Sequence, residues 1–197
     1  RVPVDMYLGF AETSLGKMVP IQVADNPLTI YAEPFNTLIV DRNGFLGQVP
    51  EGPDIMAVSP VEAYVAKKLF IHNLGHAAVA YLGFAANAKI KFIWQLVSIP
   101  QVRSAAEEAM QQAGAALLAE FPGVFTAKQI NDHIKDLLQR FSNKALGDTI
   151  SRVGRDLERK LHKSDRLMGA ILLAHKHSLP WDSIGACYRA AFSFKPD

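Results

Sequence analysis

Lys68-Leu69-Phe70-Ile71-His72-Asn73-Leu74-Gly75-His76 opens the part of the chain that decides the fold. From Leu69 to Ala88 no side chain is charged, so this run is expected to be a helix buried in the core. At about 100° per residue, a regular helix would place the amine, the amide and the two imidazoles of this stretch on one side. Polar groups are costly to bury without partners. The cluster is therefore either a hydrogen-bonded network in the core or a functional site.

The residues that follow Ser59 show the apolar spacing of helices. Ser59 is an expected N-cap, with Pro60 at the first helical position and Glu62 able to close a capping box. Thr126 and Gln129 could form a second capping box ahead of a buried stripe. That stripe consists of Ile130, Ile134, Leu137, Leu138 and Phe141. Helices are expected over residues 59–86, 89–98, 101–120, 126–141, 165–177 and 181–192.

The first part of the chain is instead rich in proline, glycine and β-branched residues. Leu28–Ala32 and Leu38–Val40 are expected to be short strands, and residues 47–58 are expected to form a loop. The expected fold class is therefore mainly α, with a multi-helix domain preceded by a short β-containing segment.

The composition of the 197 residues excludes several classes of protein. Hydrophobic residues make up 49% and charged residues 20%, which is typical of a globular domain and not of a disordered chain. A formal net charge of +2 gives no strong basic field, so nucleic acid is not an expected partner. The single cysteine, Cys187, excludes an internal disulfide and is expected to fill the core.

The uncharged run Leu69–Ala88 is nearly as long as a membrane span. It contains two histidines, two asparagines and two glycines and lacks a basic flanking loop, so a buried helix of a soluble protein is expected. The N-terminal residues 1–5 lack the apolar region of a secretory signal. We therefore expect a cytoplasmic protein without a membrane partner.

Lys68, Asn73 and His76 fit the spacing Lys-x-x-x-x-Asn-x-x-His, which resembles the motif of the polyol-specific long-chain dehydrogenases, the mannitol dehydrogenase family. Three longer stretches are similar to the same family and stand in the family's order: Phe35–Asp41, Lys68–Gly83 and Arg140–Leu167. Within the family these stretches are most similar to the branch that acts on mannitol 1-phosphate.

The resemblance implies that residues 51–197 are a helical substrate-binding and catalytic domain, similar to the C-terminal domain of 6-phosphogluconate dehydrogenase. Residues 1–50 would be strands at the edge of an N-terminal Rossmann domain that binds NAD. The chain has no Gly-x-Gly-x-x-Gly sequence, the fingerprint that receives the pyrophosphate in such domains. The implied partner is therefore the N-terminal Rossmann domain of the full-length protein, and the chain alone is expected to be inactive.

The resemblance also implies the chemistry of the motif. Lys68 would be the general acid/base, a role that a lysine fills near neutral pH only if burial or neighbouring charges lower its pKa. Asn73 and His76 would donate hydrogen bonds to the oxygen that becomes an alkoxide. The implied reaction interconverts mannitol 1-phosphate and fructose 6-phosphate with NAD and without a metal.

Residues 140–166 form a basic block with eight Lys or Arg against four acidic residues. The block is either a solvated helix surface or a phosphate clamp, because arginine binds phosphate oxygens bidentately. By the resemblance, Arg152 and Lys160 line the polyol site, and Asp41 is an acidic residue near the substrate. The candidates for the phosphate are Arg155, Arg159 and Arg166, and the sequence does not choose among them.

His72 and His76 stand four residues apart and could be read as two metal ligands. The zinc-protease pattern requires Glu after the first His, and this chain has Asn73 there. No metal site is therefore expected. His175 and His177 stand near an expected helix C-terminus, where a positive charge is favourable.

Three alternatives stay open. Within the same superfamily, the protein could be an unphosphorylated mannitol dehydrogenase or a hexuronate reductase. From another class, it could be a non-catalytic helical interaction module whose basic block meets an acidic partner. The form of residues 68–76 and the arginines of the basic block favour the phosphorylated substrate.

Overall fold

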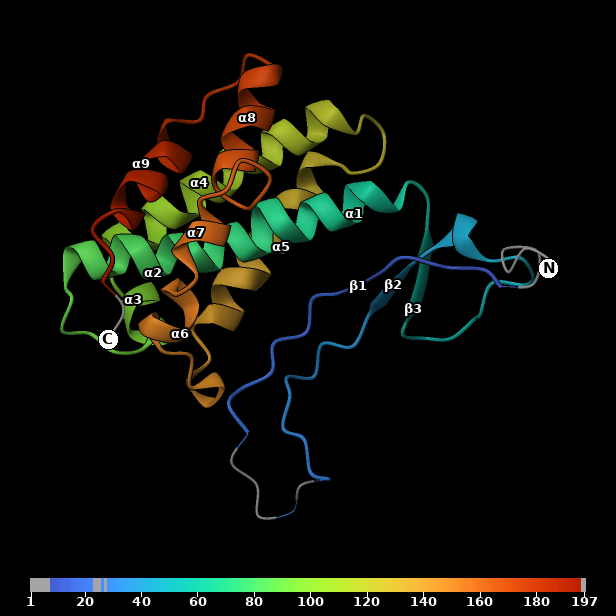
Figure 1. Ribbon diagram of the computed structural model, residues 1–197, viewed down its shortest axis with the longest axis horizontal. Coiled ribbons are helices and arrows are strands. Elements are labelled where there is room, and N and C mark those ends of the chain that lie inside the picture. Colours follow the sequence, from blue (N-terminus) through green and yellow to red (C-terminus); the bar gives the residue numbers. More distant parts are fainter. Residues whose placement is uncertain (1–7, 23–25, 27, 196–197) are drawn as a thin grey trace.

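The computed structural model describes residues 8–22, 26 and 28–195, and it is mainly helical, as predicted. A bundle of helices makes up one side of the molecule, and a small sheet lies beside it near α1 (Val61–Lys67) (Figure 1). Residues 1–5, where the sequence lacks a secretory signal, lie outside the described residues. The predicted fold class, a helical domain preceded by a β-containing segment, is confirmed.

The centre of the bundle is one long helix made of three segments. After α1 the chain continues directly into η3 (Lys68–Asn73) and α2 (Leu74–Ala86). The other helical segments along the chain are η2 (Arg42–Gly44), α3 (Ile93–Val97), α4 (Pro100–Glu120), α5 (Ala127–Phe141), η4 (Lys144–Leu146), α6 (Ile150–Gly154), α7 (Leu157–Lys160), α8 (Met168–Lys176) and α9 (Asp182–Ala191). The long α4 packs against α2, α5, α8 and α9 and shares the core with them.

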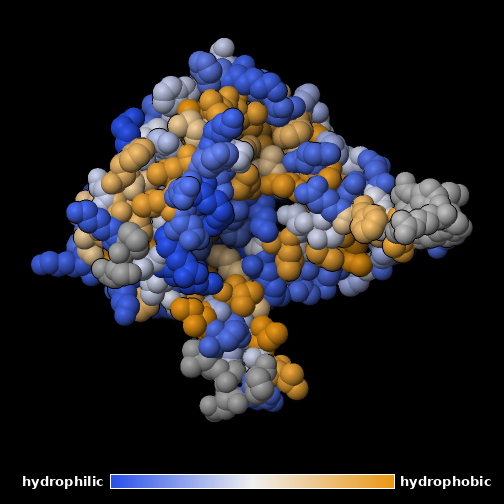
Figure 2. Space-filling view, viewed as in Figure 1, coloured by the Kyte–Doolittle hydropathy of each residue, from blue (hydrophilic) through white to orange (hydrophobic). Residues whose placement is uncertain are grey.

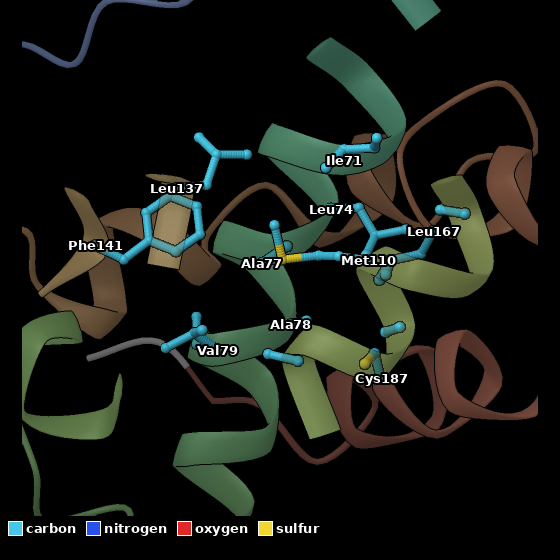
Figure 3. Close-up of a cluster of buried hydrophobic side chains, with 14 of the residues drawn as sticks. Ile71, Leu74, Ala77, Ala78, Val79, Met110, Leu137, Phe141, Leu167 and Cys187 are labelled. Carbon is cyan, nitrogen blue, oxygen red and sulfur yellow. The ribbon is translucent and has the colours of Figure 1, made fainter. Parts of the chain in front are cut away.

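The central helix is buried because its apolar side chains meet several other helices. Leu74 is fully buried in one cluster with Met110 of α4 and Phe141 of α5 (Figure 3). Gly83 allows a close approach to α3, since a Cβ there would lie 2.2 Å from Leu96 Cδ1. This packing confirms the predicted buried helix and explains its small residues.

By length and composition alone, Val61–Ala86 could cross a membrane. In this fold 56% of its most apolar window is buried, as in the core helix of a soluble protein. Cys187 lies in the same core and is fully buried, which confirms the prediction for it, and burial raises the pKa of its thiol to about 12.

The sheet has three short strands in the order β1 (Thr13–Leu15), β2 (Leu38–Asp41) and β3 (Ile55–Val58). β1 runs antiparallel to β2, and β3 runs parallel to it. The strand predicted at Leu38–Val40 is thus confirmed. The loop predicted over residues 47–58 is wrong at its end, because Ile55–Val58 form the strand β3 and pair with β2.

No strand forms at Leu28–Ala32, so that prediction is wrong. Leu28 is 88% exposed and Ile30 is 73% exposed. The backbone of Tyr31 bonds with the side chain of Gln22 instead of with another strand. Residues with β propensity form a strand only where a neighbouring strand and a surface to cover are available.

One predicted capping box is confirmed and the other is wrong. Gln129 N donates to Thr126 Oγ1 at 3.2 Å, and Thr126 N donates to Gln129 Oε1 at 2.8 Å. The apolar stripe of α5 is buried as predicted. At α1 the N-cap is Pro60 instead of Ser59, and no side chain caps this end.

The central helix is not a regular α-helix at the motif. Residues 68–73 form a π-helical turn, in which each hydrogen bond spans five residues instead of four. Such a turn holds more residues than an α-helical turn, so the spacing of about 100° per residue does not hold here. The prediction that all four polar side chains share one side was made for a regular helix, and it stays a prediction. Single π-helical turns are frequent at functional sites.

Candidate active site

Two neighbouring pockets are lined by Lys68, His72 and His76 of the central helix. The first, which we call the cationic pocket, has a volume of about 340 Å³ and is lined by His76, two acidic residues and six cationic ones. The second, the aromatic pocket, has a volume of about 370 Å³ and is lined by Lys68, His72 and several aromatic rings. Figure 2 shows a band of hydrophilic side chains beside a hollow, on the face where Figure 1 places α6 and α7.

His76 extends from α2 into the cationic pocket. Its ring stacks on Phe141, with 4.7 Å between ring centroids and an interplanar angle of 9°. Its buried Nε2 lies 3.4 Å from Asp148 Oδ2 but forms no hydrogen bond with any described residue. Burial, and then the charges of Arg152 and Lys160, lower the pKa of His76 to about 3, so its imidazole is neutral. A buried ring nitrogen without a partner is available to a ligand.

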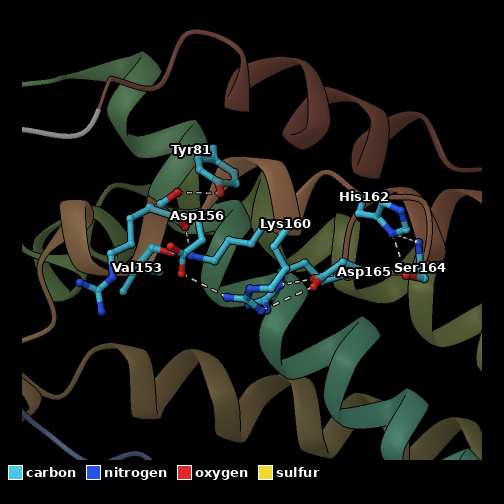
Figure 4. A network of polar contacts seen from close by, with 11 residues as sticks. Tyr81, Val153, Asp156, Lys160, His162, Ser164 and Asp165 are labelled. Atoms are coloured by element: carbon cyan, nitrogen blue, oxygen red, sulfur yellow. Dashed lines mark hydrogen bonds and ion pairs between the residues drawn. The ribbon is translucent and has the colours of Figure 1, made fainter.

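Lys160 forms a buried cationic wall of the same pocket. Its side chain is 4% exposed, and its ammonium donates to Val153 O at 2.5 Å and to Arg155 O (Figure 4). Both acceptors are neutral carbonyls, and among the described residues no carboxylate forms an ion pair with this ammonium. Burial, and then the charge of Arg166, lower the pKa of Lys160 to about 8.

The short helices α6 and α7 set the positions of these cations. Thr149 caps α6 by accepting a hydrogen bond from Arg152 N at 3.1 Å. The end of α6 is fixed from the core, where Tyr81 donates to Gly154 O at 2.9 Å (Figure 4). Asp156 then takes a left-handed φ of 63°, which Asp tolerates better than most residues, and α7 follows directly.

The arginines of the cationic pocket differ in how far acids neutralise them. Three of the four pair with carboxylates: Arg152 with Asp148, Arg166 with Asp165, and Arg159 with Asp156 and Asp165. Arg155 is exposed and has no carboxylate partner among the described residues. Its guanidinium is therefore the most available of the four to an anionic ligand.

In the aromatic pocket the cations lie against rings. Lys68 and His72 line it together with Tyr64 and Phe125. The ammonium of Lys67 lies 5.3 Å from the ring centroid of Tyr64 and 4.9 Å from that of Phe125. Burial lowers the pKa of Lys67. These contacts are cation–π interactions in partly desolvated surroundings.

Further basic groups of the aromatic pocket are neutral or paired. Burial is the main cause that lowers the pKa of His72 to about 3 and that of His133 to about 4. Arg140 Nε donates to Glu33 Oε2 at 3.0 Å, and its Nη2 donates to Glu33 Oε1. Its Nη1 lies 3.3 Å from Asp136 Oδ2. The guanidinium is thus balanced by two carboxylates.

The structure brings six of the nine predicted site residues into the cationic pocket: His76, Arg152, Arg155, Arg159, Lys160 and Arg166. Lys68 lines the aromatic pocket instead, and the half-buried Asn73 lines neither pocket. Asp41 ends β2, where its side chain accepts from Asn43 N at 3.0 Å, and it too lines neither pocket.

Sequence reasoning missed Lys17, Glu33 and Asp148. Asp148 stands four residues before Arg152, a spacing that predicts an ion pair on a helix and could have found it. Lys17 and Glu33 come from the segment that precedes the helices and meet the site only through the tertiary fold. No local pattern in the sequence indicates this.

The described residues do not by themselves fit a metal or a dinucleotide. Among them, no group of three or more His, Cys, Asp or Glu side chains could hold a metal ion. Between the parallel strands β2 and β3 the only helical segment is the single turn η2, so no α-helix N-terminus follows a strand there to receive a pyrophosphate.

The fold is shared with solved sugar-alcohol dehydrogenases. One is a mannitol 2-dehydrogenase of Pseudomonas fluorescens in ternary complex with NAD and D-mannitol, with a TM-score of 0.76 and 19% identity over 95% of this chain and 39% of that chain. Another is a substrate-free D-sorbitol dehydrogenase, with a TM-score of 0.75 and 15% identity over 96% of this chain and 40% of that chain.

Residues 60–197 match the model of the mannitol dehydrogenase C-terminal domain, and the chain belongs to this family. A mannitol-1-phosphate 5-dehydrogenase of Buchnera aphidicola is 31% identical over 191 residues, which are 97% of this chain and 49% of that protein. The Bacillus subtilis protein of the same name is 30% identical over 194 residues, or 98% and 51%. The chain thus spans about half the length of these relatives. The family resemblance found in the sequence is confirmed.

Proposed function

We propose that this chain is the substrate-binding and catalytic domain of an NAD-dependent dehydrogenase that interconverts mannitol 1-phosphate and fructose 6-phosphate. The observation that carries the proposal is the cationic pocket, in which six cationic side chains and the neutral His76 line one cavity. A phosphate ester needs several positive charges and fork-shaped donors, and an unphosphorylated polyol does not. The names of the Buchnera and Bacillus relatives support the same substrate.

In this proposal the substrate phosphate binds among Arg155, Arg159 and Arg166, and Arg152 and Lys160 contact the polyol chain. Arg155 makes the main phosphate contact because no described carboxylate competes for it. Arg159 and Arg166 keep their carboxylate partners and contribute to the positive field. Nothing in the surroundings of Asp41 supports a role for it near the substrate.

Lys68 is the proposed general acid/base, which removes the hydroxyl proton during oxidation and returns it during reduction. His76 is the proposed donor to the oxygen that becomes an alkoxide, since its neutral imidazole has a ring nitrogen without a partner. Asn73 is the second donor, carried over from the family motif. The aromatic pocket of Lys68 adjoins the cationic pocket, because the consecutive residues Gly16 and Lys17 line one each.

NAD, when bound, supplies the acceptor for the hydride that leaves the same carbon. We assign its binding to an N-terminal Rossmann domain of the full-length protein, with residues 1–50 at the edge of that domain and residues 51–197 as the helical domain. The match to only half of each relative supports this division. The chain alone is then expected not to turn over, and the full-length enzyme is expected to be cytoplasmic and independent of metals.

The second candidate function is that of an unphosphorylated mannitol dehydrogenase, which the similar fold of a mannitol 2-dehydrogenase favours. A hexuronate reductase is a further candidate, since a carboxylate would also be attracted to the cationic pocket. A non-catalytic interaction module has less support, because the cations line a cavity instead of a flat face.

The test is NADH oxidation by the full-length protein with fructose 6-phosphate and with fructose. We expect turnover of the phosphorylated sugar and a loss of about 1000-fold or more in kcat for Lys68→Ala. Lys89→Ala, at an exposed lysine outside both pockets, is the control and should keep full activity. Turnover of fructose alone would indicate that the substrate is mannitol and not mannitol 1-phosphate. If a folded, NAD-binding protein turned over neither sugar, the hexuronates and then the interaction module would be favoured.

A further inference from the structure

The segment Gly16–Val19 lies between the two pockets. Gly16 lines the aromatic pocket, where a Cβ on this residue would lie 3.7 Å from His72 Nδ1. Lys17, Met18 and Val19 line the cationic pocket. One short segment of the N-terminal part therefore forms a wall of both pockets, and it brings one cationic side chain to the arginines of α6 and α7.

Two arginines of the helical domain fix this segment. Arg140 Nη2 donates to Gly16 O at 2.5 Å, and Arg152 Nη2 donates to Val19 O at 3.2 Å. Glu33, which is bonded to Arg140 from the other side, accepts from Met18 N at 2.5 Å. The Glu33 carboxylate is 4% exposed and the Arg140 side chain 11%. The backbone on both sides of Lys17 is thus held by buried or half-buried charged groups.

The charge of Lys17 is left uncompensated by this arrangement. Its Nζ donates to Asn36 Oδ1 at 2.8 Å, and Asn36 Nδ2 donates in turn to Asp54 Oδ2 at 3.0 Å. The amide orients the ammonium but carries no net charge, and no described carboxylate pairs with Lys17 directly. Three of the four arginines in the pocket, in contrast, each have a carboxylate partner.

We propose that Lys17 is a further phosphate-binding residue that sets the preference for the phosphorylated over the unphosphorylated sugar. With Arg155, it supplies an uncompensated cation to the phosphate from the wall formed by residues 16–19, while the arginines of α6 and α7 surround it from the helical domain. The inference rests on the proposed function and adds to it a specificity-determining residue outside the helical domain. The role of Glu33 and Arg140 is to position the segment that carries Lys17.

The test compares Lys17→Met with Lys89→Met in the full-length enzyme, using fructose 6-phosphate, fructose and inorganic phosphate as an inhibitor. Methionine keeps most of the length and apolar character of the side chain and removes its charge together with its hydrogen bond to Asn36. Hydrogen bonds to charged groups contribute enough that we expect the KM for fructose 6-phosphate to rise about tenfold or more. The inhibition constant of inorganic phosphate should rise by a similar factor, while kcat and the KM for fructose stay within about twofold.

Lys17→Arg should restore most of the affinity, since it restores the charge, and a structural role would not predict this pattern. The inference is overturned if Lys17→Met matches Lys89→Met with both sugars, or if it raises the KM for fructose as much as that for fructose 6-phosphate. Failure of the proposed function has a different signature, because the wild type itself would then show no preference for the phosphorylated sugar. The melting temperature of Lys17→Met should equal that of the wild type.

Discussion

The cationic pocket and the aromatic pocket adjoin each other and both contain basic side chains, but they balance charge in opposite ways. In the cationic pocket six cations line the cavity with two acids, and the ammonium of Lys160 bonds only to carbonyls. In the aromatic pocket Arg140 is paired with Glu33 and Asp136, and Lys67 lies against aromatic rings. The first arrangement leaves positive charge for a ligand, whereas in the second Arg140 and Lys67 hold the protein together.

This difference shows that a count of basic residues does not identify a binding site. Both pockets are lined by several basic residues. What separates them is the partner of each cation, because a paired buried cation contributes to the fold and an unpaired one attracts an anion. The comparison therefore predicts opposite effects for similar substitutions in the two pockets.

The largest expected effect is a loss of folding stability in Arg140→Ala, with Arg155→Ala as the comparison. Arg140→Ala leaves the buried carboxylate of Glu33 without its partner, and breaking a buried ion pair in this way costs about 3–5 kcal/mol. Arg155→Ala removes an exposed cation from a crowd of like charges and should leave the free energy of unfolding unchanged or raise it. Urea unfolding of both variants checks this, and equal losses of stability would remove the distinction between the pockets.

The next largest effect concerns His76. His76→Phe keeps a ring to stack on Phe141 but removes the N–H donor, so kcat should fall by about 10²–10³. Because the pKa of His76 is about 3, its ring stays neutral above pH 5, and the kcat profile of the wild type should show no inflection from it between pH 5 and 8. A step near pH 6.5 that disappears in His76→Phe would show that the imidazole titrates, against the buried geometry described above.

A smaller effect is expected from the titration of Lys160. As the pH rises through its pKa of about 8, the pocket loses a cation, and the KM for fructose 6-phosphate should rise by up to about tenfold. The folded-state pKa lies below the usual 10.5, so the folded protein binds fewer protons between pH 8 and 10.5. The free energy of unfolding should therefore increase with pH in that window.

Lys160→Met should remove both of these pH dependences, and Lys89→Met should keep them. Measurements of KM and of urea midpoints from pH 7 to 10 would provide the comparison. If affinity and stability changed in the same direction with pH and were unaffected by Lys160→Met, another group would be responsible.

The smallest effect is that of salt. Raising the ionic strength from 0.05 to 0.5 M should raise the KM for fructose 6-phosphate by about two- to fivefold, because mobile ions screen the open cationic pocket. The KM for fructose and the stability lost in Arg140→Ala should change little, since neither depends on an exposed charge. A KM for fructose 6-phosphate that is independent of salt would argue against the phosphate contacts.

The sequence predicted best those features that depend on neighbouring residues. The stripe of α5 and its Thr126 cap follow from a local period and a local hydrogen bond, and the structure confirms both. The basic block was predicted as a possible clamp, and five of its members do line one pocket with His76. Four of these five stand on or beside the short helices α6 and α7, so their proximity is partly a matter of sequence distance.

The sequence failed where the geometry depends on distant residues or on an irregular backbone. Residues 68–73 form a π-helical turn, which a helical wheel does not contain, and Lys68 and His76 line different pockets. Glu33 and Arg140 are 107 residues apart, and only the tertiary fold brings them together. The strand β3 formed because β2 was available to pair with it, and Leu28–Ala32 had no such neighbour.

In the proposed function, the uncompensated charge of the cationic pocket binds the phosphate of the substrate. The most direct test is the ratio of kcat/KM for fructose 6-phosphate to that for fructose, measured with the full-length enzyme for the wild type and Arg155→Ala. We expect a wild type that strongly prefers fructose 6-phosphate, and a ratio that falls by about 10–100-fold in the variant because only the kcat/KM for fructose 6-phosphate decreases. A wild type that prefers fructose, or a variant that loses activity equally on both sugars, would contradict it.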